Sequence, residues 1–269
     1  MSDSEQPTSA GGNDAPVAIV TGGGRGIGRG IAVGLAADGF DVVVTYRRDA
    51  DAANEAVAEI ESMGRQGLAV AADVSKTEDN EHTIAATLER FGHIDALVSN
   101  GGIASRGLAV VDTTPEELQR VMATHALGPH HLCSLAVPHL REAAATRGRG
   151  DVVVISSVAT LGHAANGAPY SMGKAALESL AWVLAKEERP YGVHVNIVAP
   201  GLVETDMGRR LVKGAAGIDD IHSLDASMPF SRVCQPEDIA NAVRFFLSDK
   251  ASYVTGEKLN VHGGGQAWK

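Results

Sequence analysis

The sequence is poor in cysteine and has fewer basic than acidic residues. Its two cysteines, Cys133 and Cys234, lie far apart and show no metal-ligand spacing, so we interpret both as reduced thiols and expect no metal site. Lysine and arginine number 23 against 33 aspartates and glutamates, which gives a formal net charge of −10. This balance argues against a nucleic-acid partner and favours a solvated acidic exterior.

Long apolar runs are also absent. No run approaches the length of a membrane span, so no membrane partner is expected. The first fifteen residues have neither the basic start nor the apolar stretch of a signal peptide. They are mostly small and polar, and we expect a disordered tail over residues 1–15. The cytoplasm is therefore the expected location.

Short apolar segments alternate with helical patterns through the rest of the chain. With 44% hydrophobic residues, no repeat and no charged linker, residues 16–269 are expected to form one domain. Apolar runs without polar alternation are typical of parallel strands that are buried on both faces. The fold class predicted is α/β, a doubly wound parallel sheet of the Rossmann type with helices on both faces. The strands are expected at residues 16–21, 42–45, 68–71, 96–98, 152–155, 193–198 and 259–261.

A tyrosine and a lysine four residues apart form the most informative pair in the sequence. Tyr170 and Lys174 lie in a predicted helix, where residues i and i+4 share one face. Ionising a free phenol near pH 7 costs about 4 kcal/mol, and a neighbouring ammonium in a partly dry site recovers much of that cost. We therefore predict that Tyr170 transfers a proton and that the nearby Ser157 hydroxyl holds a substrate oxygen. The alternative is a surface pair on an ordinary helix.

A glycine-rich turn follows the first predicted strand. Residues 22–28 read GGGRGIG, and apolar residues then recur at helical spacing up to Gly39. Strand, glycine turn and helix form the context of a dinucleotide-binding fingerprint, in which N–H groups at the helix start bind the pyrophosphate. The spacing is G-x-x-x-G-x-G rather than G-x-G-x-x-G, and a flexible turn between two elements is the alternative. The predicted cofactor-binding residues of this turn are Gly22, Gly24, Arg25, Gly26, Ile27 and Gly28.

These features together resemble the short-chain dehydrogenase/reductase family, and within it the 3-oxoacyl-(acyl-carrier-protein) reductases and related carbonyl reductases. The resemblance runs from residue 16 to about residue 265 and is much more specific for the family than for the substrate. It is carried by TGxxxGIG at residues 21–28 and by Ser157, Tyr170 and Lys174. Further matching stretches are ADV at 72–74, NIVAPG at 196–201, ETDM at 204–207, PEDIA at 236–240 and YVTGE at 253–257.

The resemblance implies roles for the residues around the reaction centre. Tyr170 donates the proton, Ser157 holds the oxygen, and Lys174 lowers the pKa of Tyr170 and grips the ribose of the cofactor. Tyr170 and Lys174 are thus counted among the cofactor-binding residues as well.

The resemblance also implies cofactor contacts along the strand ends. Asp73 meets the adenine, Asn100 and Gly101 line the adenosine, and Thr205 contacts the nicotinamide amide or a phosphate. A helix cap for Asp73 and ordinary turn positions for the others are the alternatives. The remaining implied cofactor-binding residues are Val74, Pro200, Gly201 and Val203.

The end of the second predicted strand bears on the choice between NAD and NADP. An NAD-preferring site usually offers a carboxylate to the ribose there, whereas this chain has Arg47 and Arg48, with Arg25 in the glycine turn. A guanidinium binds a 2′-phosphate through paired N–H donors, and Asp49 and Asp51 lie past the expected position. We therefore predict NADP(H); three solvent-facing arginines are the alternative.

Two stretches depart from the family pattern. Residues 99–102 read SNGG where the family usually has Asn-Asn-Ala-Gly, which loosens the strand end without abolishing binding. His125 stands where the family commonly has an Asn that anchors a water in the proton relay. We count His125 as a candidate catalytic residue, because imidazole can shuttle protons near neutral pH. The alternative is that it only fills space.

Residues of about 202–231 correspond to the substrate-covering loop of the family. Their basic side chains, Arg209, Arg210 and Lys213, could hold an acyl carrier protein or a phosphopantetheine group, or could be an ordinary solvated face. The resemblance further implies a homotetramer in which the Tyr170 helix contributes to an interface.

The sequence thus predicts an NADPH-dependent reductase that turns a ketone into a secondary alcohol, with a 3-oxoacyl thioester as the leading substrate class. An alcohol or sugar dehydrogenase that works in the oxidative direction is the first alternative. A cofactor-binding sensor without turnover is the second. The presence of Ser157, Tyr170 and Lys174 argues against the sensor, and His125 argues mildly for it.

Overall fold

A computed structural model describes residues 15–264. Apart from Ala15, the expected tail over residues 1–15 lies outside the described residues. Within residues 15–264, no helix combines the length and the apolar character needed to cross a membrane.

One parallel sheet forms the centre of the molecule. Its strand order is β3-β2-β1-β4-β5-β6-β7, which confirms the predicted doubly wound α/β fold. The order reverses between β1 and β4, where Ala18 pairs with Ala96 and Val20 with Val98. The strands are β1 (Val17–Val20), β2 (Asp41–Tyr46), β3 (Gly67–Ala71), β4 (Ala96–Ser99), β5 (Gly150–Ile155), β6 (Val193–Pro200) and β7 (Lys258–Val261).

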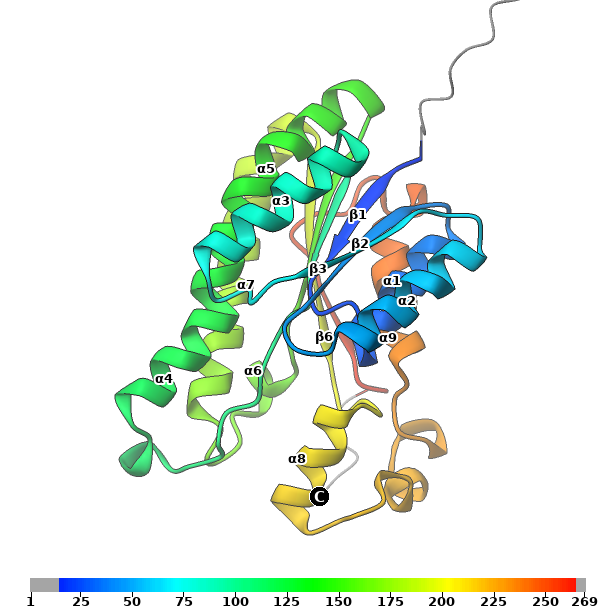
Figure 1. Ribbon diagram of the computed structural model, residues 1–269. Helices are drawn as coiled ribbons and strands as arrows, with labels where there is room; N and C mark the ends of the chain where they lie inside the picture. Colours follow the sequence, from blue (N-terminus) through cyan, green and yellow to red (C-terminus); the bar gives the residue numbers. More distant parts are fainter. Residues whose placement is uncertain (1–14, 265–269) are drawn as a thin grey trace, which may run out of the picture.

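Helices cover both faces of this sheet (Figure 1). One face packs against α1 (Gly26–Ala37), α2 (Ala50–Ser62) and α9 (Pro236–Phe246). The other packs against α3 (Thr77–Phe91), α5 (Gly128–Arg147) and α7 (Ala168–Glu188). The shorter α4 (Pro115–Met122), α6 (Ala159–Gly162) and α8 (Asp206–Ala216) lie toward the end of the molecule at which the strands terminate.

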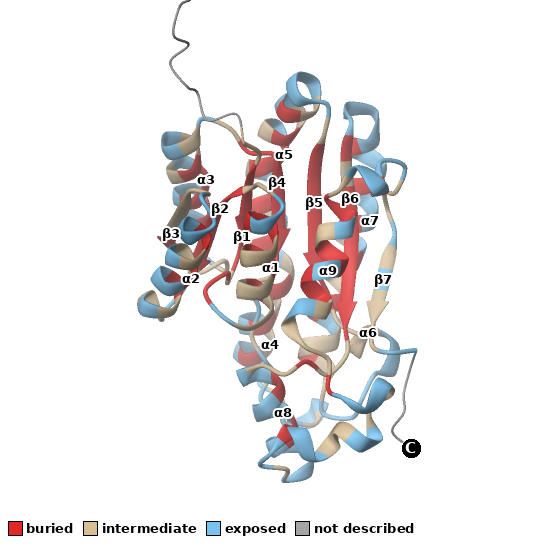
Figure 2. Cartoon of the chain, turned by 90° about the vertical axis from the view of Figure 1, so that its right-hand side faces the viewer, coloured by how far each residue is buried: buried red, intermediate tan, exposed pale blue. Residues whose placement is uncertain are grey.

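The sheet itself is the most deeply buried part of the chain (Figure 2). All four residues of β1 and all six of β5 are buried, as their apolar runs at 17–20 and 152–155 predict for parallel strands covered on both faces. The edge strand β7 is only partly buried, and Leu259 on it is 40% exposed. The two separate cores on the two faces fix the helices that carry the residues of interest.

The helical stretch that follows Pro115 is interrupted. A π-helical turn, Ala123–Leu127, joins α4 to α5, and it contains His125. Single π turns inserted into helices occur often at functional sites, because they leave the backbone locally out of register. The segment from 202 to 231 is folded as α8 followed by two 3-10 turns, Ile221–Ser227 and Pro229–Ser231, around a small apolar cluster of Val212, Ile221 and Val233.

Central strand positions are expected to contribute most to stability. Leu97 on β4 is 0% exposed, so Leu97→Ala should lower the free energy of unfolding by about 2–5 kcal/mol through lost burial and a residual cavity. Leu259→Ala on the half-covered β7 is the matched control and should cost clearly less. Urea unfolding of both variants measures this, and equal losses would contradict the assignment of the core.

Candidate active site

The glycine turn brings the start of α1 close to the ends of β1 and β4. Gly26 has φ +53°, in the left-handed region that favours glycine. A Cβ on Gly28 would lie 2.1 Å from the Gly22 carbonyl oxygen, so only glycine fits there. No side chain caps the first turn of α1, which leaves its N–H groups available to an anion. This cradle fits the pyrophosphate of a dinucleotide.

Two polar residues hold this turn in place. The Asn100 side chain donates to the Thr21 carbonyl at 2.8 Å, and the backbone N–H groups of Asn100 and Gly101 both donate to Thr21 Oγ1, at 2.9 and 2.8 Å. Asn100 is therefore a brace between β1 and β4 at the reversal of strand order. Thr21 was not among the predicted site residues, although its place before the first glycine was a usable signal.

The arginines expected to read the cofactor gather near the end of β2. Arg47 pairs with Asp73 at 3.4 Å, and Arg25 Nη1 lies 4.0 Å from Asp49 and 3.9 Å from Asp206. Burial acts to raise the pKa of Asp73, but hydrogen bonds from Ser75 and the charge of Arg47 hold it below its usual value. Arg25, Arg47 and Arg48 are all exposed, so these guanidinium groups are accessible to a ligand phosphate.

Ser157 and Tyr170 meet at the end of β5. Ser157 follows that strand, and Tyr170 lies in the first turn of α7. The Ser157 hydroxyl accepts the N–H of Ala159 at 3.2 Å and forms a side-chain hydrogen bond with Tyr170. The predicted pair is therefore brought together by two elements that are separate in sequence.

Lys174 is buried one helical turn beyond Tyr170. It is 4% exposed, and its ammonium donates to the Ile155 carbonyl at 2.7 Å. Burial lowers the pKa of Lys174 to about 8, and the carboxylate of Glu178 opposes that shift. The Lys174 Nζ lies 5.9 Å from the centre of the Tyr170 ring.

The pKa of Tyr170 differs from the sequence-based expectation. Burial raises it above the usual value, and the hydrogen bond from Ser157 acts in the opposite direction. Burial thus outweighs the lowering that was expected from Lys174, whose ammonium donates to the Ile155 carbonyl and lies 5.9 Å from the centre of the Tyr170 ring. The phenol is therefore protonated at neutral pH, which is the form that a proton donor requires.

His125 lies against this site as a neutral side chain. It is 1% exposed, its Nε2 bonds the Ile103 carbonyl at 2.7 Å, and its ring meets Tyr170 edge-on with centroids 5.2 Å apart. Burial, with the charge of Lys174, lowers the pKa of His125 to about 3. An ionisation near the unperturbed value of about 6.5 is therefore not expected from this residue.

The room for His125 comes from a glycine on α7. A Cβ on Gly173 would lie 2.8 Å from the Cβ of His125. This close approach lets the π-helical turn pack on α7 between Tyr170 and Lys174. His125 Nε2 lies 2.7 Å from the Ile103 carbonyl oxygen and 3.3 Å from the Ile103 nitrogen. The shorter contact is with an acceptor, so Nε2 carries the proton, and His125 Nδ1 is buried without a hydrogen-bond partner among the described residues.

The other predicted cofactor residues occupy neighbouring strand ends. Val203 is buried and bridges to Cys234, and Gly201 donates its N–H to the Val261 carbonyl at 2.9 Å. Thr205 caps α8 by accepting the Gly208 N–H at 3.0 Å. The Thr205 side chain, which is predicted to contact the cofactor, therefore also has a structural role as a helix cap. Val74 follows β3, and Pro200 is the last residue of β6, so both lie at the same edge of the sheet.

Basic side chains of the segment over residues 202–231 are partly neutralised within it. Arg209 pairs with Asp206 at 2.8 Å, and Lys213 pairs with Asp219 at 2.7 Å. Exposed ion pairs of this kind are weak and can exchange partners. The structure thus supports an ordinary solvated face here as readily as a docking site.

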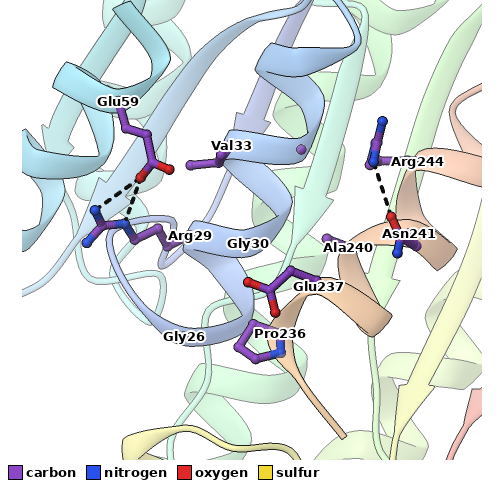
Figure 3. A pocket seen from close by; sticks show the side chains of 11 residues that line it. Gly26, Arg29, Gly30, Val33, Glu59, Pro236, Glu237, Ala240, Asn241 and Arg244 are labelled. Carbon is purple, nitrogen blue, oxygen red and sulfur yellow. Dashed lines mark hydrogen bonds and ion pairs between the residues drawn. The ribbon is translucent and has the colours of Figure 1, made fainter. Parts of the chain in front are cut away.

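A groove of about 330 Å³ lies elsewhere, between α1 and α9 (Figure 3). Arg29 spans one side of it and bonds Glu59 at 3.1 Å. None of Ser157, Tyr170, Lys174 or His125 lines it, so we do not assign it to the chemistry. Within the part of the chain that is described, no group of three or more His, Cys, Asp or Glu side chains could hold a metal ion.

Comparison with known proteins shows the family to which this chain belongs. A protein-family model described as Enoyl-(Acyl carrier protein) reductase matches residues 22–266. A 3-oxoacyl-[acyl-carrier-protein] reductase from Synechocystis sp. is 37% identical over 251 residues, which are 93% of this chain and 96% of that protein. The chain belongs to the short-chain dehydrogenase/reductase family.

Solved structures of short-chain dehydrogenase/reductases extend this result to the fold. A 3-ketoacyl-(acyl-carrier-protein) reductase from Brucella melitensis complexed with NADH has a TM-score of 0.83 at 31% identity, covering 93% of this chain and 97% of that chain. A short-chain dehydrogenase from Burkholderia cenocepacia in complex with NADP has a TM-score of 0.82 at 33% identity, covering 93% and 97%. Similar proteins thus bind either dinucleotide.

The close contact between Gly173 and His125 predicts that a glycine-to-alanine substitution destabilises the protein at Gly173, whereas the same substitution at an uncrowded helical glycine stabilises it. Gly173→Ala should lower the free energy of unfolding by about 1–3 kcal/mol, because the new methyl group overpacks the site. Gly214→Ala on α8 meets nothing within 4 Å and should raise it by about 0.5–1 kcal/mol through helix propensity. Chemical denaturation measures both changes. A stabilised Gly173→Ala protein would show that the close approach is not a constraint.

Proposed function

We propose that this chain is an NADPH-dependent carbonyl reductase that converts a ketone into a secondary alcohol, with a 3-oxoacyl thioester as the leading substrate class. The observation that carries the proposal is the assembly of Ser157, a protonated Tyr170 and a charged, buried Lys174 at the strand ends beside the glycine turn. The cofactor, when bound, supplies the hydride.

In this proposal the side chains divide the work of proton transfer. Tyr170 keeps its proton until negative charge develops on the substrate oxygen and then donates it, as a general acid. Ser157 holds that oxygen: its hydroxyl oxygen accepts the Ala159 N–H, and its proton, which bonds Tyr170 in the structure, turns to the substrate oxygen. Lys174 offers a positive charge near the phenolate left behind and holds the cofactor ribose.

The proposed cofactor site uses the residues at the carboxyl edge of the sheet. The N–H groups of Gly26, Ile27 and Gly28 bind the pyrophosphate, and Arg25, Arg47 and Arg48 favour NADP(H) through a 2′-phosphate. The further proposed contacts are Gly22, Gly24, Asp73, Val74, Asn100, Gly101, Pro200, Gly201, Val203 and Thr205. His125 stays in the proposed site as a neutral residue against Tyr170.

The proposed substrate class rests on relatives rather than on geometry. The Synechocystis sp. and Brucella melitensis proteins are described as 3-oxoacyl and 3-ketoacyl reductases of acyl-carrier-protein substrates, which supports a thioester substrate covered by the segment over about 202–231. An acyl carrier protein as partner, a homotetramer and a cytoplasmic location complete the proposal for residues 16–269.

The proposed acid can be tested by removing one oxygen atom. Tyr170→Phe should bind the cofactor normally but lose about 10²–10⁴-fold in kcat, the usual contribution of a general acid. The assay follows NADPH absorbance with a panel of ketones and 3-oxoacyl thioesters, and with the corresponding alcohols and NADP in the reverse direction. Near-normal reduction by Tyr170→Phe would contradict the assignment, and turnover of alcohols alone would favour a dehydrogenase.

Cofactor choice follows from the charges at the end of β2. The unmodified protein should bind NADPH at least tenfold more tightly than NADH, because a hydrogen bond to a charged group contributes about 1.5–3 kcal/mol. Arg47→Asp should shift the preference toward NADH. Arg29→Ala, which alters a guanidinium already paired with Glu55 and Glu59, is the control and should leave the ratio unchanged. Equal dissociation constants for the two cofactors in the unmodified protein would refute the choice of NADPH.

A further inference from the structure

A buried carboxylate lies one helical turn beyond Lys174 and has no part in the reaction described above. Glu178 is 4% exposed and occupies the third position of the series 170, 174, 178 on α7. Residues four apart share one helix face, so the acid, the ammonium and this carboxylate face the end of β5 together.

Three donors converge on one oxygen of Glu178. Oε1 accepts from Ser156 Oγ at 2.5 Å, and Lys258 Nζ lies 2.7 Å from it. The third donor, Thr160 Oγ1, shares its one proton between Oε1 and the Ser157 carbonyl, each 2.9 Å away. Lys258 comes from β7 and also donates to Thr160 Oγ1 at 2.8 Å. A buried charge is costly unless it is paired and hydrogen-bonded, and here both conditions are met.

This cluster is attached directly to the segment that carries Ser157. Ser156 precedes Ser157 in the chain, and Thr160 Oγ1 donates to the Ser157 carbonyl at 2.9 Å. Lys174 binds the carbonyl of Ile155, immediately before Ser156. The α7 face thus binds three successive residues, 155 to 157, through Lys174, Glu178 and Tyr170 respectively.

We propose that Glu178, held by Lys258, is a positioning residue of this site: it fixes the segment that carries Ser157 and places a buried negative charge beside Lys174. The proposal rests on the proposed reductase function for its effect on turnover. Its effect on Lys174 is independent of that function.

The charges around Lys174 determine the direction in which its pKa should change when Glu178 is replaced. The titratable groups facing it are Tyr170 and Glu178 on α7 and His125 on the π-helical turn, and His125 is neutral above a pKa of about 3. Glu178 is therefore the negative charge that opposes the effect of burial on Lys174. A lysine loses its charge as pH rises through its pKa, so removal of Glu178 should move that loss to lower pH.

The first test replaces the carboxylate by an amide of the same shape. Glu178→Gln should lower the pKa of Lys174 by about one unit or more, the size of shift that a nearby opposite charge produces. The alkaline fall of kcat should move to lower pH by the same amount, and kcat at its optimum should fall about tenfold or more with KM nearly unchanged. Lys258→Met leaves the carboxylate in place and should not move the alkaline fall to lower pH.

The Glu178→Gln/Lys258→Met double variant separates positioning from stability. Removing both charges relieves the unpaired ammonium and should restore much of the folding stability lost in Glu178→Gln. If Glu178 positions the site, the alkaline fall of kcat stays at the lower pH in the double variant, although its folding stability has been restored. If the pair is only structural, kcat and the pH profile return with stability, and the proposal is wrong.

A readout without turnover keeps this result distinct from the proposed function. The full-length protein labelled with ¹³C at lysine Cε is titrated by NMR, with the Lys174 signal assigned through Lys174→Arg. An unchanged Lys174 titration in Glu178→Gln would overturn the charge role of Glu178. Absence of ketone reduction by the unmodified protein would instead contradict the reductase assignment and leave the NMR test of Glu178 standing.

Discussion

The buried Lys174 ammonium imposes the constraint on which the site depends. A charge removed from water must be hydrogen-bonded and compensated within the protein, and Lys174 satisfies this requirement with the Ile155 carbonyl and the nearby Glu178. Because Ile155 is the last residue of β5, the bond fixes α7 against the end of the central sheet. Tyr170, one turn earlier, is thereby set beside Ser157.

Close approach of backbones at glycine positions makes the rest of the site possible. Gly28 lets α1 begin against the carbonyl of Gly22, and Gly173 lets the π-helical turn with His125 pack on α7. The two contacts lie at the same edge of the sheet, one at the glycine turn and one beside Tyr170. The departure from the family pattern at 125 is thus accommodated by α7 itself, and it leaves a neutral imidazole against Tyr170.

Several residues proposed to contact the cofactor also have structural tasks at this edge. Asn100 braces β1 against β4, Asp73 binds Ser75 and Arg47, and Thr205 caps α8. These three side chains are each held by a second partner, and support of this kind is the condition for accurate positioning. It also means that a substitution at one of these residues affects stability and binding together.

The sequence was enough to predict the alternation of strands and helices, the glycine turn and the spacing of Tyr170 and Lys174, because these depend on local periodicity and on a few residue types that have no substitute. It did not determine the protonation of Tyr170 and His125 or the cluster of Glu178, Ser156 and Lys258. Spacing alone could have placed Glu178 on the Tyr170 face, but not its partner, which lies 80 residues away on β7. Burial and long-range contacts decide pKa values and charge pairing, and both exist only once the sheet has brought distant strand ends together.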